Sequence, residues 1–192
     1  MMTPSAATAA ITRFWSLAAP LYDQRCLQRW VYRPAQDEVI AQLRRHGSRQ
    51  IADIACGTGI LTSRIQRELL PDEVYGIDLA DGMLAQARKR SDRVRWMSAP
   101  AETLPFTDGF LDAVVTTSAF HFFDQPAALR EFRRVLVPGG VVVATSISPG
   151  ARAVRALFTD AGLTVADQHR VRRPLWGPVS DLITVGVKPP QT

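Results

Sequence analysis

An acid before a glycine-rich turn and a second acid further along carry the first chemical signal of the sequence. Asp53 stands in an apolar run that ends at Cys56–Gly59, and Asp78 ends the next apolar run. Glycines let a ligand approach the main chain, and a helix that follows them offers free N–H groups. An acid about 20 residues after such a turn accepts the ribose hydroxyls of a nucleoside. The pattern therefore predicts a ligand that contains a nucleoside.

Two details distinguish between nucleoside ligands. The NAD pattern has a third glycine where this sequence has Thr62. A carboxylate buried at Asp53 needs donors, which the turn or a ligand ammonium can supply, and it repels a pyrophosphate. These residues favour a cationic ligand over NAD, and a tight turn without any ligand is the structural alternative.

The elements that must position these residues alternate along the chain. Strands are expected at residues 50–56, 73–79, 94–99, 111–119, 141–148, 163–171 and 181–189, and helices at 34–47, 60–70, 81–90, 124–140 and 151–162. Within them, Asp81 and Asp124 are expected to act as helix N-caps, and Pro138–Gly140 is expected to end the helix before it.

Strands separated by helices form βαβ units. The sequence therefore predicts an α/β fold with a Rossmann-like, doubly wound sheet that is mostly parallel and has helices on both faces. No helix separates the last two expected strands, so one C-terminal strand should run antiparallel.

Length and composition limit the classes of protein. A chain of 192 residues suits one domain, and the apolar fraction of 46% is ordinary for a globular protein. The first residues lack the charged start of a signal peptide, so Cys26 and Cys56 are expected to be reduced thiols in a cytoplasmic protein. The histidines, His46, His121 and His169, are scattered, and no metal site is expected.

The distribution of charge argues against a nucleic-acid partner. The formal net charge is +5, but residues 51–150, which carry the glycine turn, hold ten bases and twelve acids. A nucleic-acid binder has a continuous basic surface with interleaved aromatic residues. The basic ends of the chain are expected to be solvated arginines, with an acidic partner or a lipid surface as the alternative.

Four blocks of sequence together resemble one known family. The run "IADIACGTG" resembles motif I of the class I S-adenosylmethionine-dependent methyltransferases, and "GIDLADGML" resembles their second-strand acid and its continuation. The block "APAETLPFTDGFLDAVVTTSAFHFF" resembles the type 11 subgroup, which includes ubiquinone and menaquinone C-methyltransferase relatives, and "ALREFRRVLVPGGVVVATS" resembles a later helix and strand. The resemblance is close over residues 17–148.

The resemblance implies S-adenosylmethionine as the cofactor and a set of residues that hold it. By matching positions these are Tyr22, Asp53, Ala55, Gly57, Thr58, Gly59, Asp78, Leu79, Met83, Ala101, Glu102 and Thr117, with Thr116 as the alternative to Thr117. One position departs from the family, because Pro100 stands where an aspartate usually accepts from the adenine amino group.

The resemblance also gives each group a role. The turn would approach the methionine part of the cofactor, Asp78 would hold the ribose, and Leu79 and Met83 would pack on adenine. Ala101 and Glu102 would lie at the adenine edge, and a threonine after the fourth strand would offer a carbonyl to the cofactor amino group. Tyr22 would belong to an N-terminal helix that closes over the cofactor.

Methyl transfer from a sulfonium is an in-line displacement, in which positioning supplies most of the acceleration. An acceptor that must lose a proton needs a base, and His121 lies just past the fourth strand on the ligand side. A packing or capping role for this histidine is the alternative. The neighbouring phenylalanines, Phe120, Phe122 and Phe123, either line an acceptor pocket or belong to the core.

No long insertion follows the fifth strand to cover a substrate, so residues 1–33 are expected to form a helical cap on a methyltransferase domain at 34–192. A membrane-facing helix is the alternative reading of this aromatic, arginine-rich segment. We expect O- or C-methylation of a small, lipophilic acceptor such as a quinol, phenol or lipid. A non-catalytic protein of the same fold is the alternative, a reductase is a distant third, and the oligomeric state is not given by the sequence.

Overall fold

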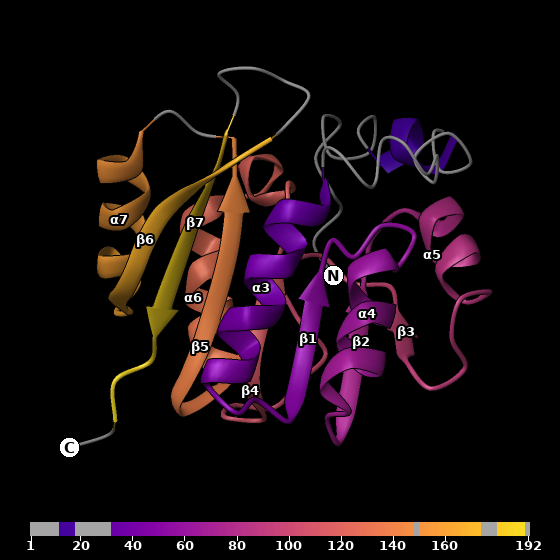
Figure 1. The fold of residues 1–192 in the computed structure, drawn as a ribbon, viewed down its shortest axis with the longest axis horizontal. Coiled ribbons are helices and arrows are strands. Elements are labelled where there is room, and N and C mark those ends of the chain that lie inside the picture. The colour runs from indigo at the N-terminus through magenta and orange to yellow at the C-terminus, as the bar shows by residue number, and fades with distance from the viewer. Residues whose placement is uncertain (1–11, 18–31, 148–149, 174–179, 191–192) are drawn as a thin grey trace.

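A seven-stranded sheet forms the centre of the molecule (Figure 1). The computed structural model describes residues 12–17, 32–147, 150–173 and 180–190. The strands are β1 (Gln50–Ile54), β2 (Glu73–Ile77), β3 (Arg95–Met97), β4 (Leu111–Thr116), β5 (Leu136–Ser146), β6 (Thr164–Arg172) and β7 (Ser180–Val187). The helices are α3 (Arg33–Arg45), α4 (Ile60–Leu69), α5 (Asp81–Ala87), α6 (Gln125–Val135) and α7 (Ala151–Asp160), with a 3₁₀ turn η2 (Phe120–Phe122).

The strand order is β3-β2-β1-β4-β5-β7-β6. All neighbouring pairs from β3 to β5 are parallel, and β7 runs antiparallel to both β5 and β6. The predicted mostly parallel sheet with an antiparallel C-terminal strand is therefore confirmed. The chain order reverses between β1 and β4, which creates the switch point where an open α/β sheet binds its ligand.

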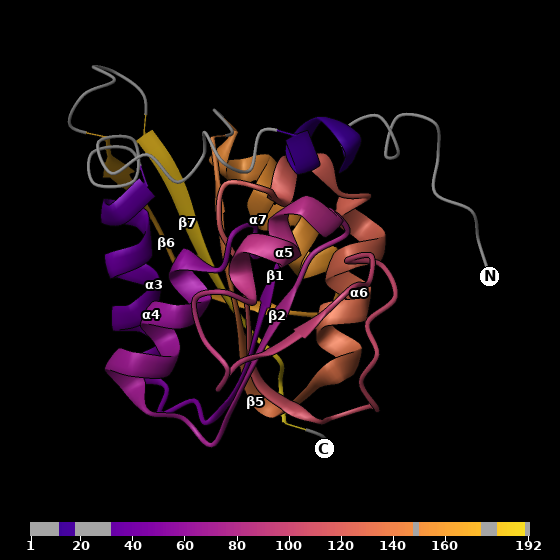
Figure 2. The same ribbon diagram turned by 90° about the vertical axis from the view of Figure 1, so that its right-hand side faces the viewer.

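Helices cover both faces of the sheet, as predicted (Figure 2). On one face, α3 and α4 pack against the side chains of Ile51, Val115 and Val143. On the other, α6 and α7 bury Phe132 and Phe158 against the opposite parity of the same strands. Because every central strand is buried on both faces, its sequence reads as a continuous apolar run rather than an alternation.

Helix α6 ends earlier than the sequence indicated. Asp124 is its N-cap, as predicted, and its side chain accepts from the Ala127 N–H at 3.1 Å. The helix was expected to run to residue 140, but it ends at Val135, and the Pro-Gly-Gly turn lies within β5. There the N–H of Gly139 donates to the Lys188 carbonyl at 2.8 Å, and the Lys188 N–H donates to Gly140 at 2.9 Å. These hydrogen bonds to the chain after β7 satisfy main-chain groups that would bond within the helix if α6 continued to residue 140.

The start of α5 also differs from the expectation. Asp81 lies in the first turn, and Ala80 is the N-cap, without a side-chain hydrogen bond. The carboxylate of Asp78 accepts from the Ala80 N–H at 2.8 Å, so the chain is already fixed one residue earlier. The helix spans seven residues rather than the predicted ten.

Two further findings concern only the described residues. No helix among them has both the length and the apolar character needed to cross a membrane. Within the same residues, no group of three or more His, Cys, Asp or Glu side chains has an arrangement that could hold a metal ion.

Candidate cofactor and acceptor site

The loop after β1 and the end of β2 are joined by a carboxylate. One oxygen of Asp78 accepts from the Gly57 N–H at 2.8 Å, and the other accepts from the Ala80 N–H at 2.8 Å. The Cys56 N–H completes the junction by donating to the Ile77 carbonyl at 3.0 Å. Burial raises the pKa of Asp78, although these main-chain donors act against the rise. The predicted ribose acid is therefore held at the switch point with its orientation fixed.

The glycine turn adopts the left-handed conformation at three positions, Ala55, Gly57 and Gly59, with φ of 55°, 56° and 76°. Glycine adopts this conformation without cost, whereas for alanine it costs about 1–2 kcal/mol. The carbonyl of Cys56 accepts from the Gly59 N–H at 3.0 Å, which closes the turn before α4 begins. Gly57 is partly exposed at the edge of the sheet, while Thr58 and Gly59 are buried.

Trp96 on β3 packs against two glycines and was not singled out from the sequence. A Cβ on Gly59 would lie 2.4 Å from Cη2 of the Trp96 ring, and one on Gly76 would lie 2.3 Å from the same ring. The indole N–H donates to the Ser91 carbonyl at 2.9 Å. Packing of Trp96 therefore gives a structural reason for Gly59, beside its predicted contact with the ligand.

Asp53 is buried with one oxygen unsatisfied. Its side chain is only 1% exposed, and Oδ2 accepts from the Thr62 hydroxyl at 2.6 Å. Oδ1 has no hydrogen-bond partner among the described residues. Burial, with a smaller contribution from the charge of Asp78, raises the pKa of Asp53 to about 7, although the hydrogen bond from Thr62 acts against the rise. Thr62, which replaces the third glycine of the NAD pattern, thus serves as the donor to this carboxylate.

An unpartnered buried carboxylate oxygen fits a positively charged ligand group. A charge buried without a partner is costly, and a cation against it removes that cost. The α-ammonium of S-adenosylmethionine is such a group, while a pyrophosphate would add a second negative charge. The residues present therefore fit the predicted cofactor better than NAD.

The residues expected around adenine differ in their surroundings. Met83 is 3% exposed and packs with Ala80 against the ring of Trp15. Ala101 is in the core, and the Glu102 carboxylate accepts from the Asp124 N–H at 3.0 Å, at the start of α6. The remaining two, Leu79 and Thr117, are partly exposed at the ends of β2 and β4, and Thr116 is buried.

A short helical segment, residues 12–17, lies beyond the carboxyl ends of the strands (Figures 1 and 2). Its Trp15 ring meets the Phe122 ring edge-on, with 6.3 Å between ring centroids. Its Ser16 carbonyl lies so close to Gly82 that a Cβ there would approach within 2.4 Å. The segment therefore touches both α5 and η2, on two sides of the predicted site. Tyr22 lies outside the described residues.

His121 stands on η2, exposed beside Phe122, with 4.1 Å between the ring centroids. Burial and the charge of Arg173 lower the pKa of His121 below its ordinary 6.5, so the imidazole is neutral at pH 7. Of the neighbouring phenylalanines, Phe120 is fully buried in the core and Phe122 is 44% exposed. Phe123 packs against the same core, so the core alternative holds for Phe120 and Phe123, while a place in an acceptor pocket stays a prediction for Phe122.

A buried ion pair fixes the turn that carries His121, and sequence reasoning missed it. The Arg173 guanidinium donates to both Asp181 oxygens at 2.8 and 2.6 Å, and the two side chains are 3% and 1% exposed. The same guanidinium donates to the Ser118 hydroxyl at 3.1 Å. Ser118 has a φ of 56°, and its N–H donates to the Thr145 hydroxyl at 2.9 Å. The only sign of this ion pair in the sequence was that Arg173 follows one expected strand and Asp181 begins the next.

Comparisons with known proteins agree with this geometry. Residues 52–144 match the family model described as a methyltransferase domain. The chain is 41% identical, over 53% of its length, to a demethylmenaquinone methyltransferase of Thermus thermophilus. It is 30% identical, over 85% of its length, to a malonyl-[acyl-carrier protein] O-methyltransferase of Halorhodospira halophila.

The same fold is found in the magnesium protoporphyrin IX methyltransferase of Synechocystis PCC 6803 with bound S-adenosylmethionine. The TM-score is 0.77 at 15% identity, over 98% of this chain and 100% of that one. The present chain spans about half the length of the two curated relatives, 48% and 55%.

The glycine turn, the acid after β2 and the matched family model define a class I S-adenosylmethionine-dependent methyltransferase domain. Within that class, the chain belongs to the type 11 subgroup, as its sequence blocks indicated. The predicted cofactor, S-adenosylmethionine, is confirmed at the level of the family.

The raised pKa of Asp53 gives a testable dependence on pH. The folded chain holds this proton up to about pH 7, while the unfolded chain releases it near 3.8. The resulting stability is fully present below pH 3.8 and is lost as pH rises through about 7. Asp53→Asn should therefore melt at a higher temperature than the parent at pH 8 without ligand, with the difference shrinking toward pH 4.

The same substitution should weaken S-adenosylmethionine binding by roughly 1–3 kcal/mol at pH 8, because it removes the partner of the ammonium. Calorimetry and thermal melts at several pH values measure both effects. Asp92→Asn, at an exposed position, is the matched control. Equal stability of Asp53→Asn and the parent at pH 8 would contradict the role of burial.

Proposed function

We propose that this protein transfers the methyl group of S-adenosylmethionine to a small, lipophilic acceptor, at an oxygen or a carbon atom. The observation that carries the proposal is the pair of carboxylates at the switch point. Asp78 is held by the Gly57 N–H, and Asp53 is buried with one oxygen unpartnered. Together they offer separate partners to the ribose hydroxyls and to the ammonium of one ligand.

The surrounding residues complete the cofactor site in this proposal. Ala55, Gly57, Thr58 and Gly59 bring the main chain close to the methionine part, and α4 begins directly after them. On the adenine side the residues are those that the family resemblance named, Leu79, Met83, Ala101, Glu102 and Thr117. The N-terminal residues 1–33, including Tyr22, cap the domain at 34–192, which is supported by the contacts of residues 12–17.

Exposed apolar side chains support a lipophilic acceptor. Among the described residues, four of the five large apolar side chains that are exposed belong to segments at the carboxyl edge of the sheet: Phe14 (62%), Leu17 (75%), Phe122 (44%) and Ile147 (43%). The fifth, Leu70 (69%), is the C-cap of α4 and lies before β2, at the opposite edge. Apolar groups gathered at one edge mark a binding surface more often than a random scatter does. The acceptor that suits this rim is a quinol, a phenol or a lipid.

Methyl transfer requires little of the protein beyond positioning the cofactor and the acceptor. When bound, S-adenosylmethionine supplies an electrophilic methyl group whose bond to sulfur breaks as the bond to the acceptor forms. His121 is neutral at pH 7 and accessible, so it can take the proton that the acceptor loses. Ser118 and Arg173 hold the turn of His121 in place, and the Trp15 ring packs edge-on against Phe122 of the same turn.

Contact with a membrane surface would suit a lipid acceptor, and cytoplasmic location stays a prediction of the sequence. The relatives named above act, by their names, on demethylmenaquinone and on malonyl-acyl carrier protein, and only the second name states the acceptor atom, an oxygen. The choice between oxygen and carbon therefore rests on the acceptor pocket.

The cofactor proposal is tested at Asp78. Asp78→Ala should weaken S-adenosylmethionine binding by roughly 1–3 kcal/mol, the range for a hydrogen bond to a charged group. Calorimetry with S-adenosylmethionine, S-adenosylhomocysteine and NAD side by side measures it, and Asp81→Ala, at the exposed start of α5, is the control. Saturable binding of NAD, with none of the sulfonium ligand, would reject the proposal.

The cap is tested at Trp15. Trp15→Ala removes ring contacts with Met83 and Phe122, so it should weaken cofactor binding severalfold, on the scale of about 1 kcal/mol for an aromatic pair. Leu17→Ala, in the same segment but 75% exposed, should leave affinity unchanged. Unchanged affinity in both variants would leave the segment without a role as a cap.

The acceptor chemistry is tested at His121. His121→Ala should lower turnover by about 10²–10⁴-fold, the usual effect of removing a base, with little change in cofactor affinity. Because the pKa of His121 lies below 6.5, turnover of the parent should decrease on acidification only below pH 6.5. This decrease should be absent in His121→Ala. The assay screens quinols, phenols and lipids, with His46→Ala as control.

Turnover within a few-fold of the parent would exclude His121 as the base. Cofactor binding without methylation of any acceptor class would instead favour the non-catalytic alternative.

A further inference from the structure

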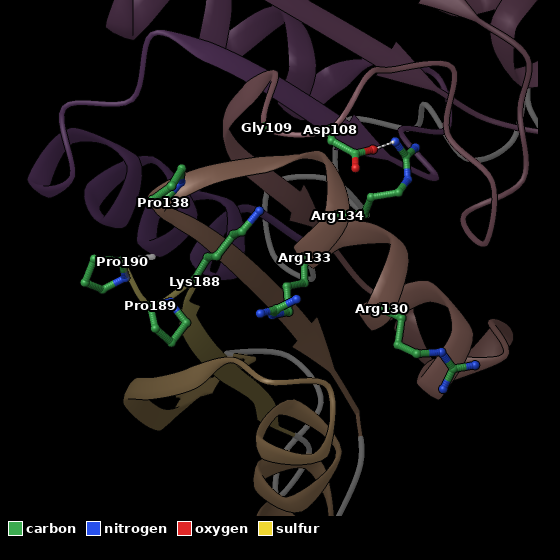
Figure 3. Close-up of a pocket in the computed structure, with 9 residues that line it drawn as sticks. All are labelled: Asp108, Gly109, Arg130, Arg133, Arg134, Pro138, Lys188, Pro189 and Pro190. Atoms are coloured by element: carbon green, nitrogen blue, oxygen red, sulfur yellow. Dashed lines mark hydrogen bonds and ion pairs between the residues drawn. The ribbon is translucent and has the colours of Figure 1, made fainter. Parts of the chain in front are cut away.

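A cavity lies at the edge of the sheet opposite the candidate cofactor site. It has a volume of about 700 Å³, and its lining comes from α6, the chain before β4, the start of β5 and the chain after β7. The lining residues are Asp108, Gly109, Arg130, Arg133, Arg134, Pro138, Lys188, Pro189 and Pro190 (Figure 3). These segments meet at the amino ends of the parallel strands, so this cavity is separate from the glycine turn.

The cavity holds four bases and one acid, and the acid is already used. Asp108 pairs with Arg134 at 2.7 Å, and Arg134 also pairs with Glu131 at 2.7 Å. Among the described residues, the hydrogen bonds of Arg133 and Lys188 go only to neutral carbonyls, although the charge of Asp108 also attracts Lys188. Arg133 donates through Nε to the Gly162 carbonyl at 3.2 Å, and Lys188 donates to the Leu136 carbonyl at 2.6 Å. Neutral carbonyls accept hydrogen bonds but do not cancel the charge.

Lys188 makes the arrangement unusual. Its side chain is 8% exposed, yet its ammonium has three N–H donors and one acceptor among the described residues. Burial and the charge of Arg133 lower the pKa of Lys188, and the smaller attraction of Asp108 opposes them, so Arg133 and Lys188 repel each other at this cavity. An anion between them would satisfy the remaining donors and remove the repulsion.

The C-terminus of α6 explains only part of this charge. A helix end carries about half a negative charge, and the bases in the last turn, Arg133 and Arg134, complement it. Arg134 already has two carboxylate partners, and Lys188 lies on another segment. The partial negative charge of the helix end is therefore too small to balance the positive charges of both Arg133 and Lys188.

We propose that this cavity binds a small solute that carries phosphate groups. The Arg133 guanidinium retains its terminal donors, which match phosphate oxygens, and the Lys188 ammonium faces the same cavity (Figure 3). Exposed Arg130 lies at the rim. The lining contains three prolines and no aromatic side chain, so it lacks the anchors of a protein interface and the stacking platforms of a nucleic-acid site.

The test is calorimetric titration of the full chain with sodium pyrophosphate at low ionic strength, against sodium chloride of matched ionic strength. We expect saturable binding to one site that weakens with added salt. Arg133→Gln should lower the affinity about tenfold or more, since Arg133 is exposed and its loss leaves the fold intact. Arg93→Gln, an exposed arginine beside β3, should change nothing.

Lys188→Gln provides a second variant, checked for folding by its melting temperature, and should weaken pyrophosphate binding to a similar extent. Sedimentation with phosphatidylglycerol vesicles separates a soluble phosphate from a lipid headgroup. Three results would overturn the proposal: no saturable binding of pyrophosphate, an equal loss in Arg93→Gln, or capture by vesicles without binding of pyrophosphate. None of these measurements depends on methyl transfer, so failure here leaves the proposed function untouched.

Discussion

The carboxylate of Asp78 is the interaction on which the cofactor site depends. It accepts from the main chain of the turn after β1 and from the N-cap residue of α5, so it fixes two loops from two strands. Neither loop has a regular hydrogen-bonding pattern of its own. Because β1 and β2 are parallel neighbours, their carboxyl ends deliver this acid and the glycine turn to one place without any long-range adjustment. The remaining acceptor capacity of the carboxylate is what a ribose would use.

Burial of the Asp53 carboxylate lowers the stability of the ligand-free chain at neutral pH, but it also provides a counter-charge for a cationic ligand. The folded chain holds a carboxyl group whose pKa lies near 7, so at neutral pH part of the population carries an unpartnered charge in the interior. Replacing it with an amide would stabilise the ligand-free fold and remove the counter-charge for a cation. Functional sites commonly retain such costs, because the ligand removes them on binding. The Thr62 hydroxyl donates to one oxygen, and the other has no hydrogen-bond partner among the described residues.

The sheet was predictable because its signal is local. Each apolar run with its following glycine or capping residue marks one βαβ unit, and the rules of right-handed, parallel connection leave few arrangements. Asp78 and the glycine turn were predictable because they follow strand ends in the sequence itself, and Asp53 because it is an acid inside an apolar strand. The end of α6 was not, since the turn at Pro138–Gly140 pairs with Lys188, about 50 residues away, and no local pattern reports that pairing.

Side chains whose roles depend on contacts between distant segments were not predictable from local patterns. Trp96 matters because a short edge strand brings its ring over Gly59 and Gly76, which belong to two other segments. Arg173 and Asp181 look like surface charges in the sequence and are among the most buried side chains in the structure. Their burial is tolerated because each completes the other's hydrogen bonds and Ser118 takes a further donor.

The two edges of the sheet differ in chemistry as a consequence of chain direction. Parallel strands place all turn residues that follow β1, β2 and β4 at the carboxyl edge, where carboxylates and exposed apolar rings gather. The antiparallel course of β7 returns Lys188 to the amino edge, beside the last turn of α6 and its arginines. A chain whose formal net charge is only +5 thereby separates the buried carboxylates of the candidate cofactor site from a cavity lined by four bases and one acid. Because the sheet lies between them, ligands at the two edges would compete for neither space nor charge.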